Sequence, residues 1–288
     1  MEGSIEGRGQ SGREPDGPPA TDPDAPHQIR RRPAGTVEST RAARTWWDHD
    51  ADRYLRRHGA ALGPVRLLWG PDGADEADLN LLGDVAGLTT AELGCGAGQV
   101  SRWLRSQGAT TVGVDVSHRM LVNAVRLDQG EPPGLRGRWV QGDAARLPLA
   151  AATFDLAVSS YGALPFLPDL DVVFAEVARI LRPGGRWVFS LTHPMRWCFP
   201  DDPGPAGLVV HRSYFDRRAY VEEGPNGSAT YVEQHHTIGD VVTSLSESGF
   251  TLTRLVEPEW VSGSWGPWSE ERGRLIPGTA LFDSVRRP

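Results

Sequence analysis

The chain of 288 residues contains no lysine, only two cysteines and no long apolar run. All of its basic residues are therefore arginine, a bias typical of GC-rich coding sequences. Cys95 and Cys198 are too few to form a disulfide framework or, by themselves, a zinc site. No stretch approaches the roughly 18 consecutive apolar residues that indicate a membrane span, and the first residues lack the apolar core of a secretory signal. We therefore expect a cytoplasmic protein.

Acidic residues outnumber basic ones, and the formal net charge at pH 7 is -7. An acidic domain argues against nonspecific binding of nucleic acid, which requires a basic surface. The short basic run at residues 30–32 is an exception, and we interpret it as part of a solvated tail. We expect no nucleic-acid partner, no membrane partner, and either a monomer or a homodimer.

Residues 1–37 are rich in Pro, Gly, Asp and Arg and nearly free of large apolar side chains. Such a segment cannot bury enough surface to offset the entropy lost on ordering, so it is predicted to be a disordered tail. From residue 38 the character changes, and residues 38–288 are predicted to form one folded domain.

Short apolar segments alternate with amphipathic segments in this domain. The apolar runs predict strands at residues 89–93, 110–115, 138–143, 154–160, 186–192, 250–258 and 278–285. The spacing of apolar residues and the capping signals predict helices at 39–59, 74–85, 99–107, 117–127, 169–181 and 237–249. Such alternation implies an α/β fold in which helices cover both faces of a seven-stranded, mostly parallel sheet.

Residues 194–236 interrupt this pattern with many Pro, Gly and aromatic residues. Two candidate strands at 217–223 and 229–236 flank Gly224-Pro225-Asn226-Gly227 and predict an inserted β-hairpin. The segment begins where the strand at 186–192 ends, so we expect it to form a cap over the carboxyl end of the sheet. Its aromatic side chains suit a small, partly apolar or aromatic ligand.

A glycine-rich segment, Glu92-Leu93-Gly94-Cys95-Gly96-Ala97-Gly98, lies between the first strand of the sheet and the next helix. Glycines let the backbone turn sharply and bring N–H groups and a helix N-terminus against a ligand. The dinucleotide pattern G-x-G-x-x-G would need glycine at position 99, where the chain has Gln99. The fingerprint of a dehydrogenase is therefore absent.

Two acidic residues end the next two predicted strands. Asp115 ends the strand at 110–115, and Asp143 ends the strand at 138–143. Ligands of open α/β sheets bind outside the carboxyl ends of the strands. A carboxylate at position 115 is placed to accept hydrogen bonds from two ribose hydroxyls, and one at position 143 to accept from an adenine amino group.

The segments AELGCGAG, VGVD, GDAARLP, TFDLAVSS and RILRPGGRWVFS together resemble the class I S-adenosylmethionine-dependent methyltransferases. The resemblance is strongest to the small-molecule branch that includes the quinone-biosynthesis methyltransferases, and it covers residues 89–192. It implies a Rossmann-like sheet, S-adenosylmethionine as cofactor, an N-terminal helical lid, and in-line transfer of the methyl group to a small molecule. It leaves open the acceptor and the choice between O-, N- and C-methylation.

The resemblance also implies which residues contact the cofactor. Around the methionine part it places Glu92, Gly94, Gly96 and Gly98. It places Asp115 at the ribose and Asp143 at the adenine amino group, and Ala144 and Ser160 also belong to the cofactor site. Ser160 and Tyr161 lie at the end of the fourth strand, where the methyl group points, and Tyr54 closes over the cofactor carboxylate.

Catalysis requires little acid–base chemistry, because a sulfonium methyl is already activated and the enzyme mainly aligns the reactants and excludes water. A general base is needed only if the acceptor must lose a proton. His193 and Tyr161 are the candidate catalytic residues, although His193 also fits a structural, hydrogen-bonded histidine. His211, His235 and His236 lie in the insertion without an acid or cysteine at metal-ligand spacing, so we expect no metal.

Tryptophans are the remaining candidates for an acceptor pocket. Those near termini or loops around the expected cleft are Trp46, Trp197, Trp260, Trp265 and Trp268. Those in regular elements, and therefore expected in the core, are Trp103, Trp139 and Trp187.

Two other function classes stay open. Nucleic-acid methyltransferases that act on base amino groups resemble one another in an Asn-or-Asp-Pro-Pro-aromatic stretch after the fourth strand, where this chain has Ser159-Ser160-Tyr161-Gly162. That difference, like the acidic charge, disfavours a nucleic-acid or protein methyltransferase. A non-catalytic, cofactor-binding regulatory protein also agrees with the glycine loop and the two acids, because a fold does not determine a function.

Overall fold

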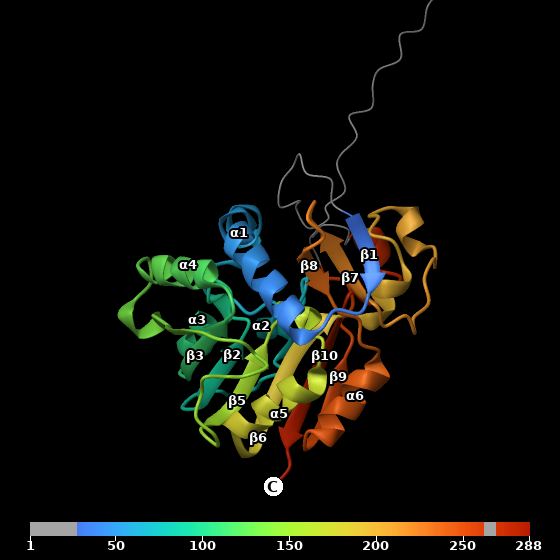
Figure 1. The fold of residues 1–288 in the computed structure, drawn as a ribbon. Coiled ribbons are helices and arrows are strands. Elements are labelled where there is room, and N and C mark those ends of the chain that lie inside the picture. Colours follow the sequence, from blue (N-terminus) through green and yellow to red (C-terminus); the bar gives the residue numbers. More distant parts are fainter. Residues whose placement is uncertain (1–27, 262–268) are drawn as a thin grey trace, which may run out of the picture.

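The computed structural model describes residues 28–261 and 269–288. Within these residues the main sheet has seven strands in the order β4-β3-β2-β5-β6-β10-β9 (Figure 1). The strands are β2 (Thr89–Leu93), β3 (Thr110–Asp115), β4 (Arg138–Gln141), β5 (Phe154–Ser159), β6 (Leu181–Thr192), β9 (Phe250–Val256) and β10 (Thr279–Arg286).

Strand directions agree with the prediction. Neighbouring strands are parallel from β4 through β6, whereas β10 is antiparallel to both β6 and β9. The predicted seven-stranded, mostly parallel sheet is therefore confirmed. The carboxyl ends of the parallel strands meet at one edge of the sheet, which is the upper edge in Figure 1.

Helices cover both faces, as predicted. α5 (Leu170–Ile180) and α6 (Ile238–Glu247) pack on one face, and α3 (Gln99–Ser106) packs on the other. Local capping fixes where several of them begin. The Ser117 side chain accepts from the Met120 amide at the start of α4 (His118–Asp128), and a similar cap from Asp169 precedes α5.

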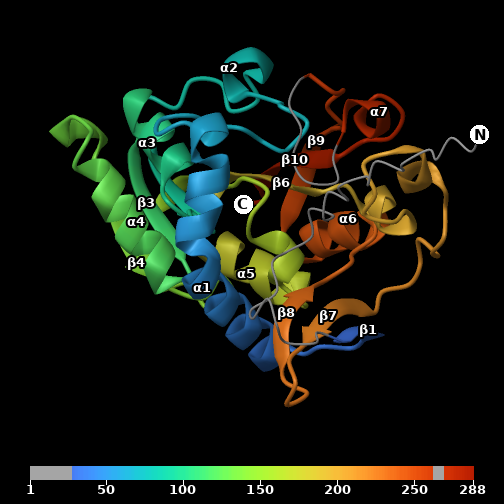
Figure 2. The same ribbon diagram turned by 90° about the horizontal axis from the view of Figure 1, so that it is seen from above.

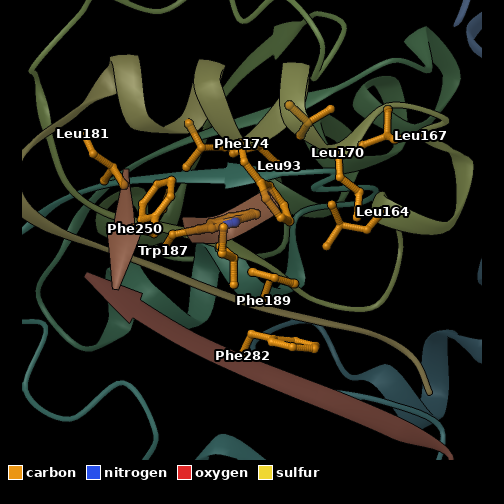
Figure 3. Packing of buried hydrophobic residues seen from close by; sticks show 14 of the residues in the cluster. Leu93, Leu164, Leu167, Leu170, Phe174, Leu181, Trp187, Phe189, Phe250 and Phe282 are labelled. Atoms are coloured by element: carbon orange, nitrogen blue, oxygen red, sulfur yellow. The ribbon is translucent and has the colours of Figure 1, made fainter. Parts of the chain in front are cut away.

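The larger core lies between the sheet and the α5–α6 layer (Figure 3). Its centre is a stack of aromatic rings, with centroids 4.9 Å apart for Trp187 and Phe189 and 5.0 Å apart for Phe189 and Phe282. Along β6 these rings alternate with Val188, which packs in the core on the opposite face. The apolar run that predicted this strand therefore reflects burial on both faces of the sheet.

α1 (Thr36–Leu62) crosses the carboxyl edge of the sheet (Figure 2). It is held to α4 by hydrogen bonds. Asp48 Oδ1 accepts from Ser117 Oγ at 2.7 Å and from the Arg119 amide at 3.0 Å. The Arg119 guanidinium also pairs with Asp52 at 2.5 Å. The helix predicted at 39–59 is thus present, longer at both ends and fixed above the sheet.

A second, smaller sheet has the order β1-β7-β8 and lies beside α1 above the main sheet (Figures 1 and 2). Its strands are β1 (Gln28–Arg32), β7 (Ala219–Glu223) and β8 (Ala229–Glu233). β7 and β8 form an antiparallel hairpin where the sequence predicts one. Small apolar residues of this sheet pack against Ala42 of α1, so the hairpin supports the helix.

The prediction of disorder is wrong for residues 28–37. The backbone of β1 pairs with β7, and Arg30 and Arg32 each place Nε 2.8 Å from a carboxylate oxygen of Glu223. Composition missed this strand because its partner lies far away in the sequence and supplies both the backbone hydrogen bonds and the opposite charge. Residues 1–27, the rest of the predicted tail, lie outside the described residues.

The helix predicted at 74–85 is also wrong over most of its length, because α2 spans only Glu76–Leu79. Asn80 ends it in the left-handed region, with φ 46°. The buried Glu76 carboxylate accepts from Trp69 Nε1 at 2.8 Å and from the Leu82 amide at 2.6 Å. These bonds fold the chain back on itself and prevent the helix from continuing.

Short elements complete the described chain. They are α7 (Glu270–Gly273) and the 3₁₀ helices η1 (Pro133–Leu135), η2 (Leu164–Phe166), η3 (Pro194–Cys198) and η4 (Pro205–Leu208). Among the helices of residues 28–261 and 269–288, none is long and apolar enough to cross a membrane. Trp265 and Trp268 lie outside the described residues.

Candidate active site

A cavity, here called the main cavity, opens at the carboxyl ends of the parallel strands and is covered by α1. The segments after β2, β3, β4 and β5 form its floor. Its lining includes eight of the nine residues predicted to bind the cofactor, namely Tyr54, Glu92, Gly94, Gly96, Asp115, Asp143, Ala144 and Ser160. The fold thus brings together side chains that are widely separated in sequence.

The glycine loop has two kinds of glycine. Gly94, with φ +67°, is sterically required, because an added Cβ would lie 2.7 Å from the Ala163 Cβ. Gly96, with φ +51°, would meet nothing within 4 Å and leaves backbone open to the main cavity. Gly98 does not line the cavity. It caps α3 with φ +83°, and a Cβ there would lie 2.2 Å from the Trp139 ring.

Asp115 is fixed by backbone amides at the end of β3. Its Oδ2 accepts from the Gly96 amide at 2.8 Å and its Oδ1 accepts from the Ser117 amide at 2.8 Å. Burial raises the pKa of Asp115 to about 6, although these bonds favour the ionised form. A rigid carboxylate with unused lone pairs therefore faces the main cavity and suits a ligand with hydroxyl donors.

Glu92, at the end of β2, is more deeply buried and has one partner on α3. Its Oε2 accepts from Ser101 Oγ at 2.5 Å. Burial raises the pKa of Glu92 to about 8, so this carboxyl holds its proton far above its usual range. A cation in the cavity would draw off that proton and pair with the carboxylate.

Asp143 connects the floor of the cavity to its roof. Its Oδ1 accepts from the Ala145 amide at 2.9 Å, and its Oδ2 accepts from Thr40 Oγ1 of α1 at 3.0 Å. Thr40 was not predicted as a site residue. Asp143 therefore both faces the cavity and positions the beginning of the helix above it.

One face of α1 forms the roof through Thr40, Ala43, Trp47 and Tyr54. Their spacing of three, four and seven residues keeps them on one side of a helix, a signal that the predicted helix already contained. The Trp47 ring meets the Tyr54 ring edge-on, with centroids 5.4 Å apart, and meets Phe166 at 5.7 Å. Burial raises the pKa of Tyr54, so its hydroxyl keeps its proton.

Comparison with known proteins identifies the region that carries this site. Residues 91–189 match the model of a methyltransferase domain family. Methyltransferase GfsG of Streptomyces halstedii is 39% identical over 104 residues, which are 35% of this chain and 36% of that protein. Ubiquinone biosynthesis O-methyltransferase of Paracidovorax citrulli is 28% identical over 162 residues, or 56% of this chain and 61% of that protein. The chain therefore spans less than two thirds of these relatives.

A solved structure matches over a greater length. An S-adenosylmethionine dependent methyltransferase from Mesorhizobium loti is 29% identical, with a TM-score of 0.56, and the match covers 75% of this chain and all, or 100%, of that protein. In residues 91–189 and in its fold the chain is therefore similar to the class I S-adenosylmethionine-dependent methyltransferases. The family resemblance stated from the sequence motifs is thereby confirmed.

The cofactor of those methyltransferases, S-adenosylmethionine, fits the residues that line the main cavity. Its ammonium, its ribose hydroxyls and its adenine amino group donate hydrogen bonds, and carboxylates of Glu92, Asp115 and Asp143 face the cavity from three neighbouring strand ends. Apolar side chains of Met120 and Leu147 line the same cavity and suit the faces of a purine ring.

Two neighbouring residues at the end of β5 lie in different surroundings. Ser160 lines the main cavity, and its hydroxyl donates to the Leu68 carbonyl. Tyr161 does not line it. This residue has φ +59° and its amide donates to Ser190 Oγ at 2.8 Å, while its half-buried side chain lies beside Thr192 and Arg196. The structure therefore places the predicted catalytic tyrosine outside the lining of the main cavity.

His193 lies outside the lining of the main cavity, and both of its ring nitrogens are engaged. Nδ1 accepts from the Met195 amide at 3.1 Å, so Nε2 carries the proton and donates to Glu257 Oε1 at 2.7 Å. Burial lowers the pKa of His193. This geometry is that of the structural histidine considered as the alternative, and we do not propose a role as general base.

The other histidines and tryptophans of the cap are mostly structural. His235 Nε2 donates to the Tyr214 carbonyl at 2.7 Å, and His236 Nε2 donates to the Leu167 carbonyl at 2.9 Å. Trp46 is buried against Tyr231 at a centroid distance of 4.8 Å. A second pocket lies in the cap. Among the predicted pocket tryptophans that the structure describes, Trp197 is the one that lines it.

Proposed function

We propose that the chain binds S-adenosylmethionine in the main cavity and transfers the methyl group to a small molecule. The observation that carries this proposal is the convergence of three carboxylates, Glu92, Asp115 and Asp143, on one cavity below a fixed helix. When bound, the cofactor supplies a methyl group that its sulfonium has already activated.

Each carboxylate has a distinct task in this proposal. Asp115, held by two amides at 2.8 Å, accepts hydrogen bonds from the ribose hydroxyls. Asp143, whose Oδ2 already binds Thr40, accepts from the adenine amino group. Glu92 pairs with the ammonium of the methionine part, and the positive charge brings its raised pKa down.

The remaining lining supports water exclusion and an acceptor that is partly apolar or aromatic. Trp47, Tyr54 and Phe166 bring aromatic surface to the cavity from α1 and η2. Such walls keep water from the reacting atoms and leave alignment as the main contribution of the protein to the rate. We place the acceptor between this wall and the end of β5, where Ser160 lies.

Calorimetry with S-adenosylhomocysteine tests the cofactor half of the proposal. We expect a Kd in the micromolar range or tighter, and no heat or thermal shift at millimolar ligand would overturn it. Incubation with labelled cofactor and a metabolite extract then tests the transfer. Label in a small molecule supports the proposal, label in protein or nucleic acid replaces it by a macromolecular methyltransferase, and binding without transfer indicates a regulatory protein.

A further inference from the structure

A second pocket, here called the cap pocket, lies within the inserted segment and is closed on one side by β1. Arginine and aromatic side chains dominate its lining, which includes Arg31, Arg196, Trp197, Arg212, Tyr220 and Glu233. The residues come from β1, η3, β7, β8 and the loop after η4. No part of the methyltransferase match at residues 91–189 contributes to it.

Arg31 differs from its two neighbours in the basic run. Alternation along β1 sends Arg30 and Arg32 to the face where both pair with Glu223. Arg31 points to the other face, into the cap pocket. Its guanidinium carbon lies 4.6 Å from the centroid of the Trp197 ring and 5.0 Å from that of Tyr220. The basic run is therefore not a solvated tail.

The Arg31 guanidinium is held without a carboxylate. Its Nε is buried and has no hydrogen-bond partner, and within residues 28–261 and 269–288 no ion pair joins Arg31 or Arg212 to an acid. Burial, followed by the charge of Arg212, lowers the pKa of Arg31 to about 10. Stacking on two rings orients the cation but leaves its N–H donors for another acceptor.

The acids of the cap pocket are engaged elsewhere. Asp201 lies 2.6 Å from Arg196 Nη2, and Glu233 accepts from the Tyr231 hydroxyl at 2.6 Å. Burial raises the pKa of Glu233, while the charge of Arg196 lowers it. The nearby Asp216 pairs with Arg218 at 2.8 Å. The cap pocket therefore keeps an excess of positive charge in a partly dry, aromatic setting.

Contacts between side chains connect the lining of the main cavity with that of the cap pocket. Phe166 lines the main cavity and meets the Tyr231 ring edge-on, with centroids 5.6 Å apart. The Tyr231 hydroxyl in turn binds Glu233, which lines the cap pocket. An acceptor whose anionic group lies in the cap pocket would therefore have its body directed along these side chains toward the main cavity.

We propose that the cap pocket binds the anionic group of the methyl acceptor, a carboxylate or a phosphate, between Arg31 and Arg212. This inference rests on the proposed function, since it gives the acceptor of that site a second recognition point. The guanidinium donors supply charge-assisted hydrogen bonds, and Trp197 and Tyr220 supply flat apolar walls. The acceptor is accordingly an anion with a planar or apolar body.

The test uses the full chain saturated with S-adenosylhomocysteine and two probes of one shape, benzoate and its neutral counterpart benzamide, with inorganic phosphate as a third. We expect benzoate or phosphate to bind in calorimetry, and benzamide to bind at least about tenfold more weakly, since it lacks the charge that the arginines attract. Equal binding of benzoate and benzamide, or no binding of either anion, would overturn the proposal.

Neighbouring residues give a matched pair of variants. Arg31→Met keeps the stem and removes the guanidinium, so it should weaken anion binding about tenfold. Arg30→Met, on the other face of the same strand, should change it less than about twofold. Equal effects of the two substitutions would show a general loss of charge or of β1, and would contradict a site at Arg31.

A chemical readout separates this proposal from the proposed function. Phenylglyoxal modifies arginine, and the chain has no lysine to compete. Benzoate should slow modification of Arg31, located by mass spectrometry of peptides, and should do so equally in an Asp115→Asn variant that binds cofactor poorly. Protection without cofactor binding would keep the cap pocket and reject the methyltransferase. Cofactor binding without protection of Arg31 would keep the proposed methyltransferase and reject the anion site in the cap pocket.

Discussion

The main cavity and the cap pocket present opposite charge from different kinds of structure. Carboxylates from the ends of β2, β3 and β4 face the main cavity, and backbone amides hold Asp115 in place. Arginines from an edge strand and loops face the cap pocket, where Arg31 is oriented by two aromatic rings. The main cavity therefore suits a ligand with hydrogen-bond donors, such as the cofactor, and the cap pocket suits an anion.

This difference separates the two tasks that we propose for the protein. Strand ends are fixed by the whole sheet, so the positions of their carboxylates change little when loops change. Loops and insertions tolerate substitution and carry specificity in many folds. A methyltransferase built this way keeps its cofactor site in the sheet and places the choice of acceptor in the cap.

The largest effect is expected from a substitution that weakens ligand binding in the main cavity and leaves the cap pocket unchanged. Asp115→Asn should weaken S-adenosylhomocysteine binding about ten- to a hundredfold, because roughly 1.5–3 kcal/mol of hydrogen bonding to a charged group is lost. Calorimetry measures the change. Arg31→Met is the control and should leave this affinity within about twofold, and a similar loss in both variants would mean that the two sites are not independent.

The affinity of the main cavity for S-adenosylhomocysteine should change with pH in two steps. Ionised Asp115 accepts hydroxyl donors, and its pKa is about 6, so affinity should fall roughly tenfold per pH unit below that value. Ionisation of Glu92 near its pKa of about 8 should raise affinity again as the pH increases, because the carboxylate then attracts the ligand's ammonium. Titrations between pH 5 and 8.5 follow both steps.

Variants assign these two steps. Asp115→Asn should remove the step near pH 6 and Glu92→Gln the step near pH 8. Benzoate binding in the cap pocket should show neither step. A pH profile that survives in both variants would assign the titration to other groups.

Thr40→Val tests whether the roof acts on the cofactor through Asp143. Removing the 3.0 Å hydrogen bond should cost about 0.5–1.5 kcal/mol, or roughly two- to tenfold in S-adenosylhomocysteine affinity. Thr45→Val, at an exposed position of the same helix, is the matched control. Indistinguishable affinities in the two variants would reduce Thr40 to a packing residue.

Two truncations sharpen the boundary between tail and cap. Deleting residues 1–35 removes β1 with its pairing to β7, and a loss of about 1–3 kcal/mol should lower the melting temperature by about 3–10 °C. Deleting residues 1–27 should change it by less than about 2 °C, as the composition of that segment predicts. Equal melting temperatures for both truncations would show that β1 contributes no stability.

The smallest expected effect on methyl transfer comes from His193→Gln. Since both ring nitrogens serve the fold, the variant should melt at a lower temperature yet transfer label to the same product within about threefold. The pH dependence of that transfer should be unchanged. A loss of transfer of a hundredfold or more, with an intact fold by circular dichroism, would restore His193 as a general base.

The local sequence pattern was sufficient to predict the elements of the main sheet, because the residues of each element specify it. The apolar run around Trp187, Val188 and Phe189 predicts a strand, which the structure buries on both faces, and Ser117 and Asp169 mark helix starts by capping. The predictions failed where a side chain or a distant strand overrides the local pattern. The Glu76 side chain binds the Leu82 amide and ends α2 early, and β1 is ordered by the distant strand β7.

The site shows the same division. Motif order within residues 89–192 placed Glu92, Asp115 and Asp143 correctly around one cavity, since parallel strands must end at the same edge. Spacing could not distinguish Gly96, which opens on the cavity, from Gly98, which packs against Trp139. That distinction depends on a ring brought from another strand.

By itself the sequence determined the seven-stranded sheet and the acids of the main cavity, because short-range periodicity and strand-end positions encode them, and the resemblance of its motifs indicated the family. Tertiary structure alone decided that Thr40 binds Asp143, that His193 is committed to Glu257, and that Arg31 stacks between Trp197 and Tyr220. These contacts join residues separated by tens to hundreds of positions. Their existence follows from how folded elements pack, a property that no local window of the chain contains.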